Sequence, residues 1–310
     1  MASKKHKNFI HGWLPIIKPV GIASAAVVAT VKRLTGAHKV GHAGTLDPLA
    51  SGIILIALGA ATKTVPYAME LSKTYKFIVR WGISTDTDDS EGSVVKKSDV
   101  RPNKADIKTA LKMFVGETLQ TPPIYSAIKI KGKRAYKLAR EGKPILLKPR
   151  TICISRLNLV SILDDNNAEF EVVSGKGMYV RALGRDLALK LGTYGHIRRL
   201  DRISIGHFNK DNSVEYEFLK QEMHDKGSFV KNLLKPVEAV LGDVLRVVLT
   251  EREAHKMLSG QSVSFDPIAR RSEPLDFSSG RVISAMYGGR LIALGKINSG
   301  HIHPFRVLSI

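Results

Sequence analysis

The chain has 310 residues, which is enough for one large domain and an appendage, and Lys and Arg outnumber Asp and Glu by 48 to 28. The formal charge of +20 and the pI near 10.0 exceed what solubility requires and indicate a polyanionic partner, with nucleic acid as the leading candidate. No apolar run is long enough to span a bilayer, and the single cysteine, Cys153, excludes intrachain disulfides and argues against structural zinc, so we expect a reducing cytoplasm.

The N-terminal residues 1–10 are predicted to be a disordered basic tail, because they carry several lysines and lack the apolar core of a signal peptide. The fold is expected to begin with a strand at 13–17, followed by a Lys-Pro-Val-Gly turn at 18–21. Ser24 is the predicted N-cap of the next helix, and Gly36 is placed to end that helix.

The next segment, GHAGTLDPLASG at 41–52, is called the aspartate loop here, since Asp47 is its only acid. Its glycines allow close approach of another molecule to the backbone, and Pro48 directs Asp47 away from the helical region. The apolar run at 53–58 predicts a buried element that anchors the loop. Spacing alone is compatible with a catalytic site and equally with a glycine-rich turn that carries no chemistry.

Residues 62–71 suit a helix, and the alternation at 73–82 predicts a strand with Tyr75 near its start. The acidic cluster DTDDSEG at 86–92 does not match an EF-hand, because Glu91 stands where the loop needs glycine. A solvated turn before a further strand is the predicted structure. A magnesium ion bound together with RNA is the alternative left open.

After an amphipathic helix that Asn103 opens, residues 124–150 form what we call the basic insertion, with nine Lys or Arg residues and the single acid Glu141. Tyr125 and Tyr136 are interleaved with the charges, as suits a segment that grips a phosphate backbone and offers rings to bases. A solvated face is the alternative. The side chains expected to contact RNA are Lys129, Lys131, Lys133, Arg134, Lys137 and Arg140.

Two strands at 151–163 and 168–174 are predicted to form an antiparallel hairpin before the segment GKGMYVRALGRDLALKLG at 175–192. That segment predicts a helix with Arg181 and Arg185 on one face. A cation at a helix start is unfavourable for the macrodipole, so Arg181 is expected to have a carboxylate partner, although a surface position with a solvated head is also compatible with the spacing.

A strand-like stretch at 195–208 is the last part of the first domain, and a boundary is predicted near residue 241. Beyond it Thr250 and Glu253 form a predicted capping box, and short strands with glycine turns follow. A small β-rich appendage is the expected structure. His301 is interpreted as a surface residue without metal.

Four stretches of the chain resemble, in the same order, the TruB family of tRNA pseudouridine synthases. They are IKPVGIAS at 17–24, GHAGTLDPLASG at 41–52, KTYKFIVRWGISTDTDDSEG at 73–92 and GKGMYVRALGRDLA at 175–188. The resemblance implies an α+β pseudouridine synthase fold with a central, mainly antiparallel sheet over 11–240, and a small β-rich PUA-like RNA-binding domain over 241–310. It also implies conversion of uridine 55 in the T-loop of tRNA to pseudouridine, with no cofactor and no metal.

The same resemblance implies roles for single residues. Asp47 matches the family's catalytic nucleophile, Arg181 matches the arginine that pairs with it and favours the ionised carboxylate, and Tyr75 matches the tyrosine that stacks on the target base. Tyr179 and Leu200 match positions that line the uracil pocket.

The target base must be flipped out of a folded loop, and His42 matches the histidine that fills the space it leaves. The basic insertion coincides with a mobile segment that closes on the RNA in this family. The chain departs from the family pattern at three positions, and the last of them places a negative charge where RNA is expected to pass: Ala23, Met178 and Asp201.

The expected partner is the T-arm of tRNA, bound by a cytoplasmic monomer that needs no membrane, guide RNA or protein partner. Two alternatives share the same surface: a non-catalytic RNA-binding or tRNA-folding protein, and a pseudouridine synthase for another RNA. A phosphate-binding enzyme is disfavoured, because the aspartate loop lacks the lysine followed by serine or threonine that closes a P-loop.

Overall fold

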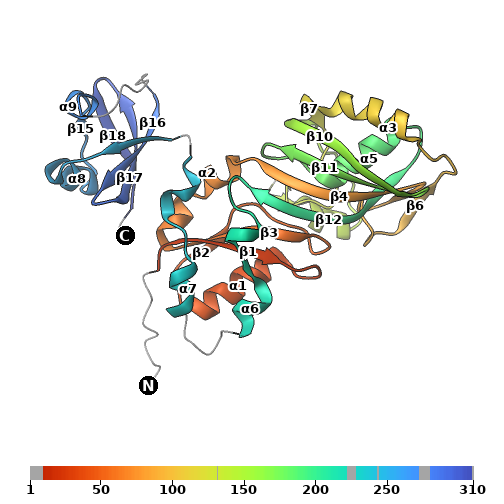
Figure 1. The fold of residues 1–310 in the computed structure, drawn as a ribbon, viewed down its shortest axis with the longest axis horizontal. Helices are drawn as coiled ribbons and strands as arrows, with labels where there is room; N and C mark the ends of the chain where they lie inside the picture. The colour runs from red at the N-terminus through yellow and green to blue at the C-terminus, as the bar shows by residue number, and fades with distance from the viewer. Residues whose placement is uncertain (1–9, 131, 222–227, 243, 272–279, 309–310) are drawn as a thin grey trace.

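The computed structural model describes residues 10–130, 132–221, 228–242, 244–271 and 280–308, and these residues form two large β-sheets (Figure 1). The larger sheet occupies the N-terminal two thirds of the chain, and the smaller one lies at one end of the molecule. No helix in the described part of the chain is long and apolar enough to cross a membrane.

The larger sheet has nine strands and is mainly antiparallel, as predicted; only the pairs β1 with β13 and β3 with β12 are parallel among its described neighbours. In spatial order the strands are β13 (Val214–Glu215), β1 (Gly12–Lys18), β3 (Ser51–Leu58), β12 (Gly195–Ile205), β4 (Lys73–Trp81), β11 (Asn167–Ser174), β10 (Arg150–Asp164) and β7 (Gly116–Gln120), and β2 (Val40–His42) pairs with β3. The predicted hairpin of 151–163 and 168–174 is confirmed as β10 and β11.

One half of this sheet, β4, β11 and β10, is covered by α3 (Lys104–Leu111) and α5 (Val180–Lys190) (Figure 1). Strand β4 alternates as predicted, with Phe77 and Val79 buried against the helices. The rings of Phe77 and Phe170 stack at 5.4 Å in the centre of this core. The predicted start of α3 is also confirmed, because the Asn103 side chain accepts a hydrogen bond from the backbone N–H of Asp106.

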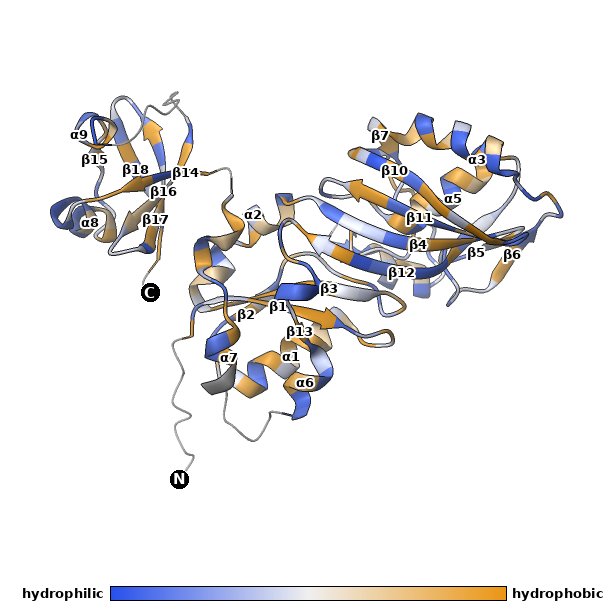
Figure 2. Cartoon of the chain, viewed as in Figure 1, coloured by the Kyte–Doolittle hydropathy of each residue, from blue (hydrophilic) through white to orange (hydrophobic). Residues whose placement is uncertain are grey.

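The other half, β1 and β3, is buried on both faces. Alternate residues of β3 pack against α1 (Ser24–Thr35) and α6 (Tyr216–Gln221) on one face. On the opposite face they pack against the 3₁₀ turns η1 (Gly59–Lys63) and η5 (Val237–Val240). Strand β3 is apolar from Ile53 to Leu58, whereas β12 beside it carries a hydrophilic stretch, which is blue in Figure 2. Helix α1 ends at Gly36 in the left-handed conformation, as predicted.

Three local predictions are wrong here. The helix expected at 62–71 is split into η1 and α2 (Val65–Glu70), because Pro66 in the first turn of α2 suits a helix start and not a helix interior. Ile10, assigned to the disordered tail, is buried in the core under α1, while residues 1–9 lie outside the described part of the chain. Ser24 is not a cap: the N-cap of α1 is Ala23, without a side-chain bond.

The C-terminal sheet has its own apolar core and five strands. In spatial order they are β14 (Leu245–Val248), β16 (Val282–Tyr287), β17 (Arg290–Asn298), β18 (His301–Val307) and β15 (Val263–Ser264), with α8 (Glu251–Leu258) and α9 (Asp266–Ala269) beside them. The capping box of Thr250 and Glu253 is present. This sheet contacts the larger domain through η1, where the Lys63 ammonium donates to the Val307 carbonyl at 2.5 Å.

The remaining described elements are short. They are β5 (Ile83–Thr85), β6 (Val94–Lys97), η2 (Lys112–Phe114), β8 (Lys129–Ile130), β9 (Lys133–Arg134), α4 (Ala135–Arg140), η3 (Lys210–Asn212) and α7 (Ser228–Leu233). Of these, β8, β9 and α4 belong to the basic insertion, which projects from the edge strand β7 towards the start of α5.

Candidate active site

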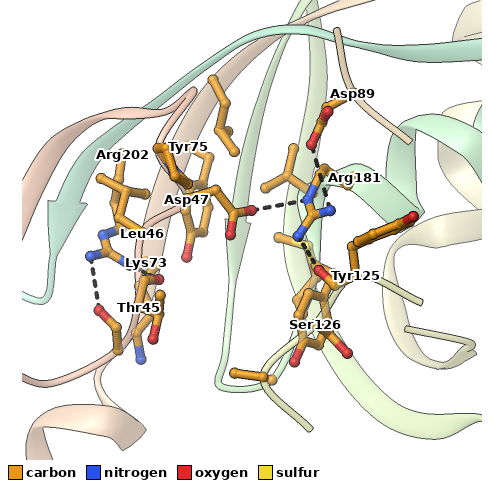
Figure 3. A pocket seen from close by; sticks show the side chains of 18 of the residues that line it. Thr45, Leu46, Asp47, Lys73, Tyr75, Asp89, Tyr125, Ser126, Arg181 and Arg202 are labelled. Carbon is orange, nitrogen blue, oxygen red and sulfur yellow. Dashed lines mark hydrogen bonds and ion pairs between the residues drawn. The ribbon is translucent and has the colours of Figure 1, made fainter. Parts of the chain in front are cut away.

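A cavity of about 630 Å³ opens where the aspartate loop, β4, β12, the start of α5 and the basic insertion meet. Figure 3 shows Asp47 and Arg181 pointing towards each other across it, with Tyr75 beside the carboxylate. These segments lie far apart in the sequence, so the sheet brings them together. The structure therefore places all three predicted catalytic residues on one cavity.

The backbone on the N-terminal side of Asp47 is fixed by Ser24. The serine hydroxyl donates to the Leu46 carbonyl at 2.8 Å and accepts from the Leu46 N–H at 2.9 Å. This contact explains why Ser24 is not the cap of α1: its hydroxyl serves the aspartate loop instead. A two-bond clamp of this kind leaves the neighbouring carboxylate little freedom to shift.

The backbone on the C-terminal side is fixed by the turn that follows β1. The Gly21 N–H donates to the Pro48 carbonyl at 2.7 Å, and the Lys18 ammonium lies 3.5 Å from the same carbonyl and 2.8 Å from that of Pro19. Lys18 has no exposed surface, and burial lowers its pKa to about 8, while nearby Asp47 acts in the opposite direction. The Lys-Pro-Val-Gly turn thus supports the aspartate loop.

Arg202 on β12 is a further support that sequence reasoning missed. Its guanidinium is buried and donates to the Ile53 carbonyl at 2.7 Å and to the carbonyls of Thr45 and Gly44 at 3.3 Å each. The backbone of Arg202 also passes so close to Gly52 that a Cβ there would collide with it. One signal was available: Arg202 lies two residues after Leu200 on a strand, and so on the same face.

Arg181 lies at the start of α5 with 6% of its side chain exposed, and it has the carboxylate partner that its position demanded. Its Nε lies 2.9 Å from Oδ2 of Asp47. Its Nη1 lies 3.5 Å from Asp89 and donates to the Thr87 carbonyl, and its Nη2 donates to the Tyr125 carbonyl, both at 2.9 Å. Asp47 itself is 34% exposed, so one face of its carboxylate remains open to the cavity.

The acidic cluster at 86–92 is a turn before a further strand, as predicted, and Asp86 and Glu91 are exposed, but two of its aspartates are not solvated. Asp89 is buried beside Arg181, and Asp88 pairs with Arg185 at 2.9 Å. Burial raises the pKa of Asp88, and the Arg185 guanidinium partly offsets that effect. Two arginines one turn apart on α5 draw two consecutive aspartates inward, and local sequence cannot reveal this because the partners are about 90 residues apart.

Most of the residues predicted to bind the target base lie around this ion pair. Tyr75, Tyr179 and Leu200 all line the cavity, as does Met178, one of the departures from the family pattern. Burial raises the pKa of the Tyr179 phenol. The backbone of Tyr179 is held by the Gln120 side chain, which accepts from its N–H at 2.9 Å and donates to its carbonyl at 3.1 Å.

Two residues behave differently from the others. His42 lies in β2 at the base of the aspartate loop and is not among the residues that line the cavity, and burial lowers the pKa of its imidazole. Asp201 does not present a bare negative charge, because it pairs with Arg199 at 2.7 Å and accepts a hydrogen bond from Ser51. The negative charge of Asp201, which was expected to repel RNA, is therefore balanced by Arg199 on the same strand.

The basic insertion reaches the cavity with part of its length. Tyr125, Ser126, Tyr136 and Arg140 line it, and the Arg140 guanidinium lies 5.8 Å from the centre of the Tyr136 ring. Of the other predicted RNA contacts, four are exposed: Lys129, Lys133, Arg134 and Lys137. Lys131 lies outside the described residues. Within the described part of the chain, no group of three or more His, Cys, Asp or Glu side chains is placed to hold a metal ion.

Comparison with known proteins gives two family matches. Residues 32–180 match the TruB family pseudouridylate synthase N-terminal domain, and residues 181–242 match the tRNA pseudouridylate synthase B C-terminal domain. The chain is 45% identical to tRNA pseudouridine synthase B of Rhodospirillum rubrum over the full length of both proteins. It is 44% identical to the protein of that name from Gluconacetobacter diazotrophicus, over 98% of this chain and 99% of the relative.

Solved structures show the same fold at lower identity. A Cbf5-Nop10-Gar1 complex aligns with a TM-score of 0.73 and 21% identity over 98% of this chain and 92% of the other. An archaeal box H/ACA Nop10-Cbf5 complex aligns with a TM-score of 0.71 and 20% identity over 98% and 93%. These likenesses confirm the α+β fold predicted from the sequence.

Proposed function

The chain belongs to the TruB family of tRNA pseudouridine synthases, and from that premise we propose that it isomerises uridine 55 in the T-loop of tRNA, with Asp47 as the nucleophile. One observation carries the assignment of the nucleophile. Among the acidic residues that line the cavity, Asp47 is partly exposed, its backbone is clamped on both sides, and its carboxylate lies 2.9 Å from the Arg181 guanidinium.

The geometry suits an isomerisation that needs no other reactant. Attack or proton transfer by Asp47 allows the glycosidic bond between C1′ and N1 of the uridine to break. The uracil then turns within the cavity and rejoins C1′ through C5. The proton on C5 is lost and N1 gains one, so the composition of the nucleotide is unchanged. Tyr75 stacks on the base and stands beside Asp47, where it assists removal of the C5 proton.

Substrate binding follows from shape and charge. Tyr179 and Leu200 enclose the flipped-out uracil, and His42 fills the space that the base leaves in the RNA. The exposed cations of the basic insertion contact the phosphate backbone of the T-arm, which accounts for the high positive charge. Residues 241–310 form a separate unit that adds RNA contacts.

The protein acts as a cytoplasmic monomer on free tRNA, without a guide RNA or a protein partner. The cavity supports this part of the proposal, because the nucleophile, its arginine and the residues that enclose the base all come from one chain.

The test is to map pseudouridine by position in an unmodified tRNA transcript after incubation with the wild-type chain and with Asp47→Asn. We expect product at the T-loop uridine with the wild type and none with the variant, while both bind the transcript equally. Tight binding by the wild type without product anywhere would exclude tRNA modification and favour a binding or folding role. Product at another position would correct the substrate site.

A further inference from the structure

Ser126 lies in the basic insertion with its side-chain hydroxyl buried beside the cavity. Its side chain is 4% exposed and lines the cavity, yet its hydroxyl oxygen has no hydrogen-bond partner of standard geometry among the described residues. Burying a hydroxyl without a partner costs free energy, so such a group is expected to gain a partner in the working complex.

The backbone of Ser126 is held by hydrogen bonds through both its N–H and its carbonyl, which fixes the position of the Cβ that carries the hydroxyl. The Ser126 N–H donates to the Ile124 carbonyl at 2.9 Å, and its carbonyl accepts from Tyr136 at 3.1 Å. The preceding carbonyl, that of Tyr125, accepts from Arg181, the residue that pairs with Asp47. Ser126 is thus tied to the nucleophile through one guanidinium, and Figure 3 shows it on the same side of the cavity as Arg181.

We propose that Ser126 is a substrate-binding residue whose hydroxyl hydrogen-bonds the flipped-out target nucleotide. The inference rests on the proposed function and extends it: the basic insertion recognises the nucleotide itself as well as the phosphate backbone. A serine hydroxyl can both donate and accept, and a uridine offers acceptors at O2 and O4, a donor at N3 and a ribose hydroxyl.

One neighbour supplies a rival explanation. The Tyr179 phenol lies close enough for Ser126 to lower its pKa, although burial has the larger and opposite effect. Ser126 could therefore act by positioning Tyr179 instead of touching substrate. The two explanations differ in what happens when the phenol oxygen is removed.

The experiment compares kcat/KM on a tRNA transcript for Ser126→Ala, Ser126→Thr and Ser174→Ala. Ser174 is a matched control, because its hydroxyl is also buried and without a partner but does not line the cavity. We expect Ser126→Ala to lower kcat/KM roughly threefold to tenfold, the range for one neutral hydrogen bond. The threonine variant keeps the hydroxyl and should recover most of the loss, and Ser174→Ala should match the wild type.

Two further readouts separate substrate contact from a structural role. Ser126→Ala should unfold in urea at the same or a higher concentration than the wild type, because the Ser126 hydroxyl makes no hydrogen bond of standard geometry with the described residues. Its penalty should also persist in a Tyr179→Phe background. A transcript with 2′-deoxyuridine at the target places the contact: loss of the penalty assigns it to the ribose, and persistence assigns it to the base.

Three results would overturn the proposal while leaving the proposed function intact: an alanine variant as active as the wild type, a penalty that disappears in the Tyr179→Phe background, or a loss of activity matched by a loss of stability. A wild-type chain without activity on tRNA would instead contradict the proposed function.

Discussion

The aspartate loop and the basic insertion line the same cavity, but they are held in different ways. The loop is clamped through its backbone by Ser24, Lys18 and Arg202, all of which are buried. The insertion exposes most of its cations, and near its start the Arg181 guanidinium donates to the Tyr125 carbonyl.

Under the proposed function, the difference follows from what each segment would do. A nucleophile works only when its carboxylate stays within a fraction of an ångström of the reacting atom, so the loop is fixed by buried donors. Phosphate contacts act over a longer range and require exposed charges. Helix α5 joins the two, because Arg181 binds Asp47 of the loop and the backbone of the insertion.

Replacing Arg181 should affect the aspartate loop and the basic insertion together, because Arg181 contacts both segments. In Arg181→Met, Asp47 loses its ion-pair partner and Asp89 is left buried without a cation. We expect kcat/KM to fall roughly 10²- to 10³-fold and the free energy of unfolding to fall by about 3–5 kcal/mol. Single-turnover kinetics and urea unfolding measure the two effects. Arg181→Lys keeps the positive charge but loses the planar guanidinium, so its kcat/KM and its stability should lie between those of Arg181→Met and the wild type. Wild-type stability in Arg181→Met would contradict the assigned network.

The second prediction concerns the aspartate loop alone and removes one of the side chains that hold its backbone. Arg202→Met removes three hydrogen bonds to the loop and its adjoining strand. A misplaced nucleophile should cost roughly 10- to 100-fold in kcat, with about 2 kcal/mol of stability and little change in tRNA affinity. Arg198, exposed on the same strand, provides the control Arg198→Met. If both variants keep wild-type kcat, the loop does not depend on the clamp.

The third prediction concerns the exposed cations of the basic insertion. In the test, four of them are replaced with glutamine: Lys129, Lys133, Arg134 and Lys137. We expect tRNA affinity to fall about tenfold or more and the slope of log K against log salt to become shallower by roughly 0.9 for each phosphate that the variant no longer neutralises. The kcat at saturating tRNA should change little. Lys104 and Lys108, exposed on α3, provide a matched double variant. Equal losses of tRNA affinity in the two variants would show that the basic insertion contributes only general surface charge.

The smallest expected effect is the pH dependence that Lys18 confers on stability. Burial lowers the pKa of folded Lys18 to about 8 from an ordinary value of 10.5, so the unfolded chain binds more protons between these two values. The cost of burying the charged amine is therefore present in full below pH 8 and is relieved as pH rises towards 10.5. In urea unfolding from about pH 7 to about pH 10, the stability of the wild type should rise relative to Lys18→Met. Parallel pH profiles would show that Lys18 titrates normally.

Much of the fold could be predicted from local patterns. The alternation of β4, the all-apolar run of β3, the glycine that ends α1 and the capping box of α8 depend on neighbours within a few residues, and each is present in the structure. The helix predicted at 62–71 is wrong for an equally local reason, because Pro66 is favoured in the first turn of a helix and disfavoured in its interior.

Local sequence was enough to single out the aspartate loop, the strand with Tyr75 and the expectation of a carboxylate beside Arg181. The folded sheet brings Asp47 and Asp89 to that arginine, and Ser24 and Arg202 to the loop. The bond from Arg202 to Ile53 joins residues 149 positions apart. The burial of a charged or polar side chain cannot be predicted from its neighbours in the sequence. Such burial requires hydrogen-bond partners, and here the folded sheet brings those partners close from distant parts of the chain.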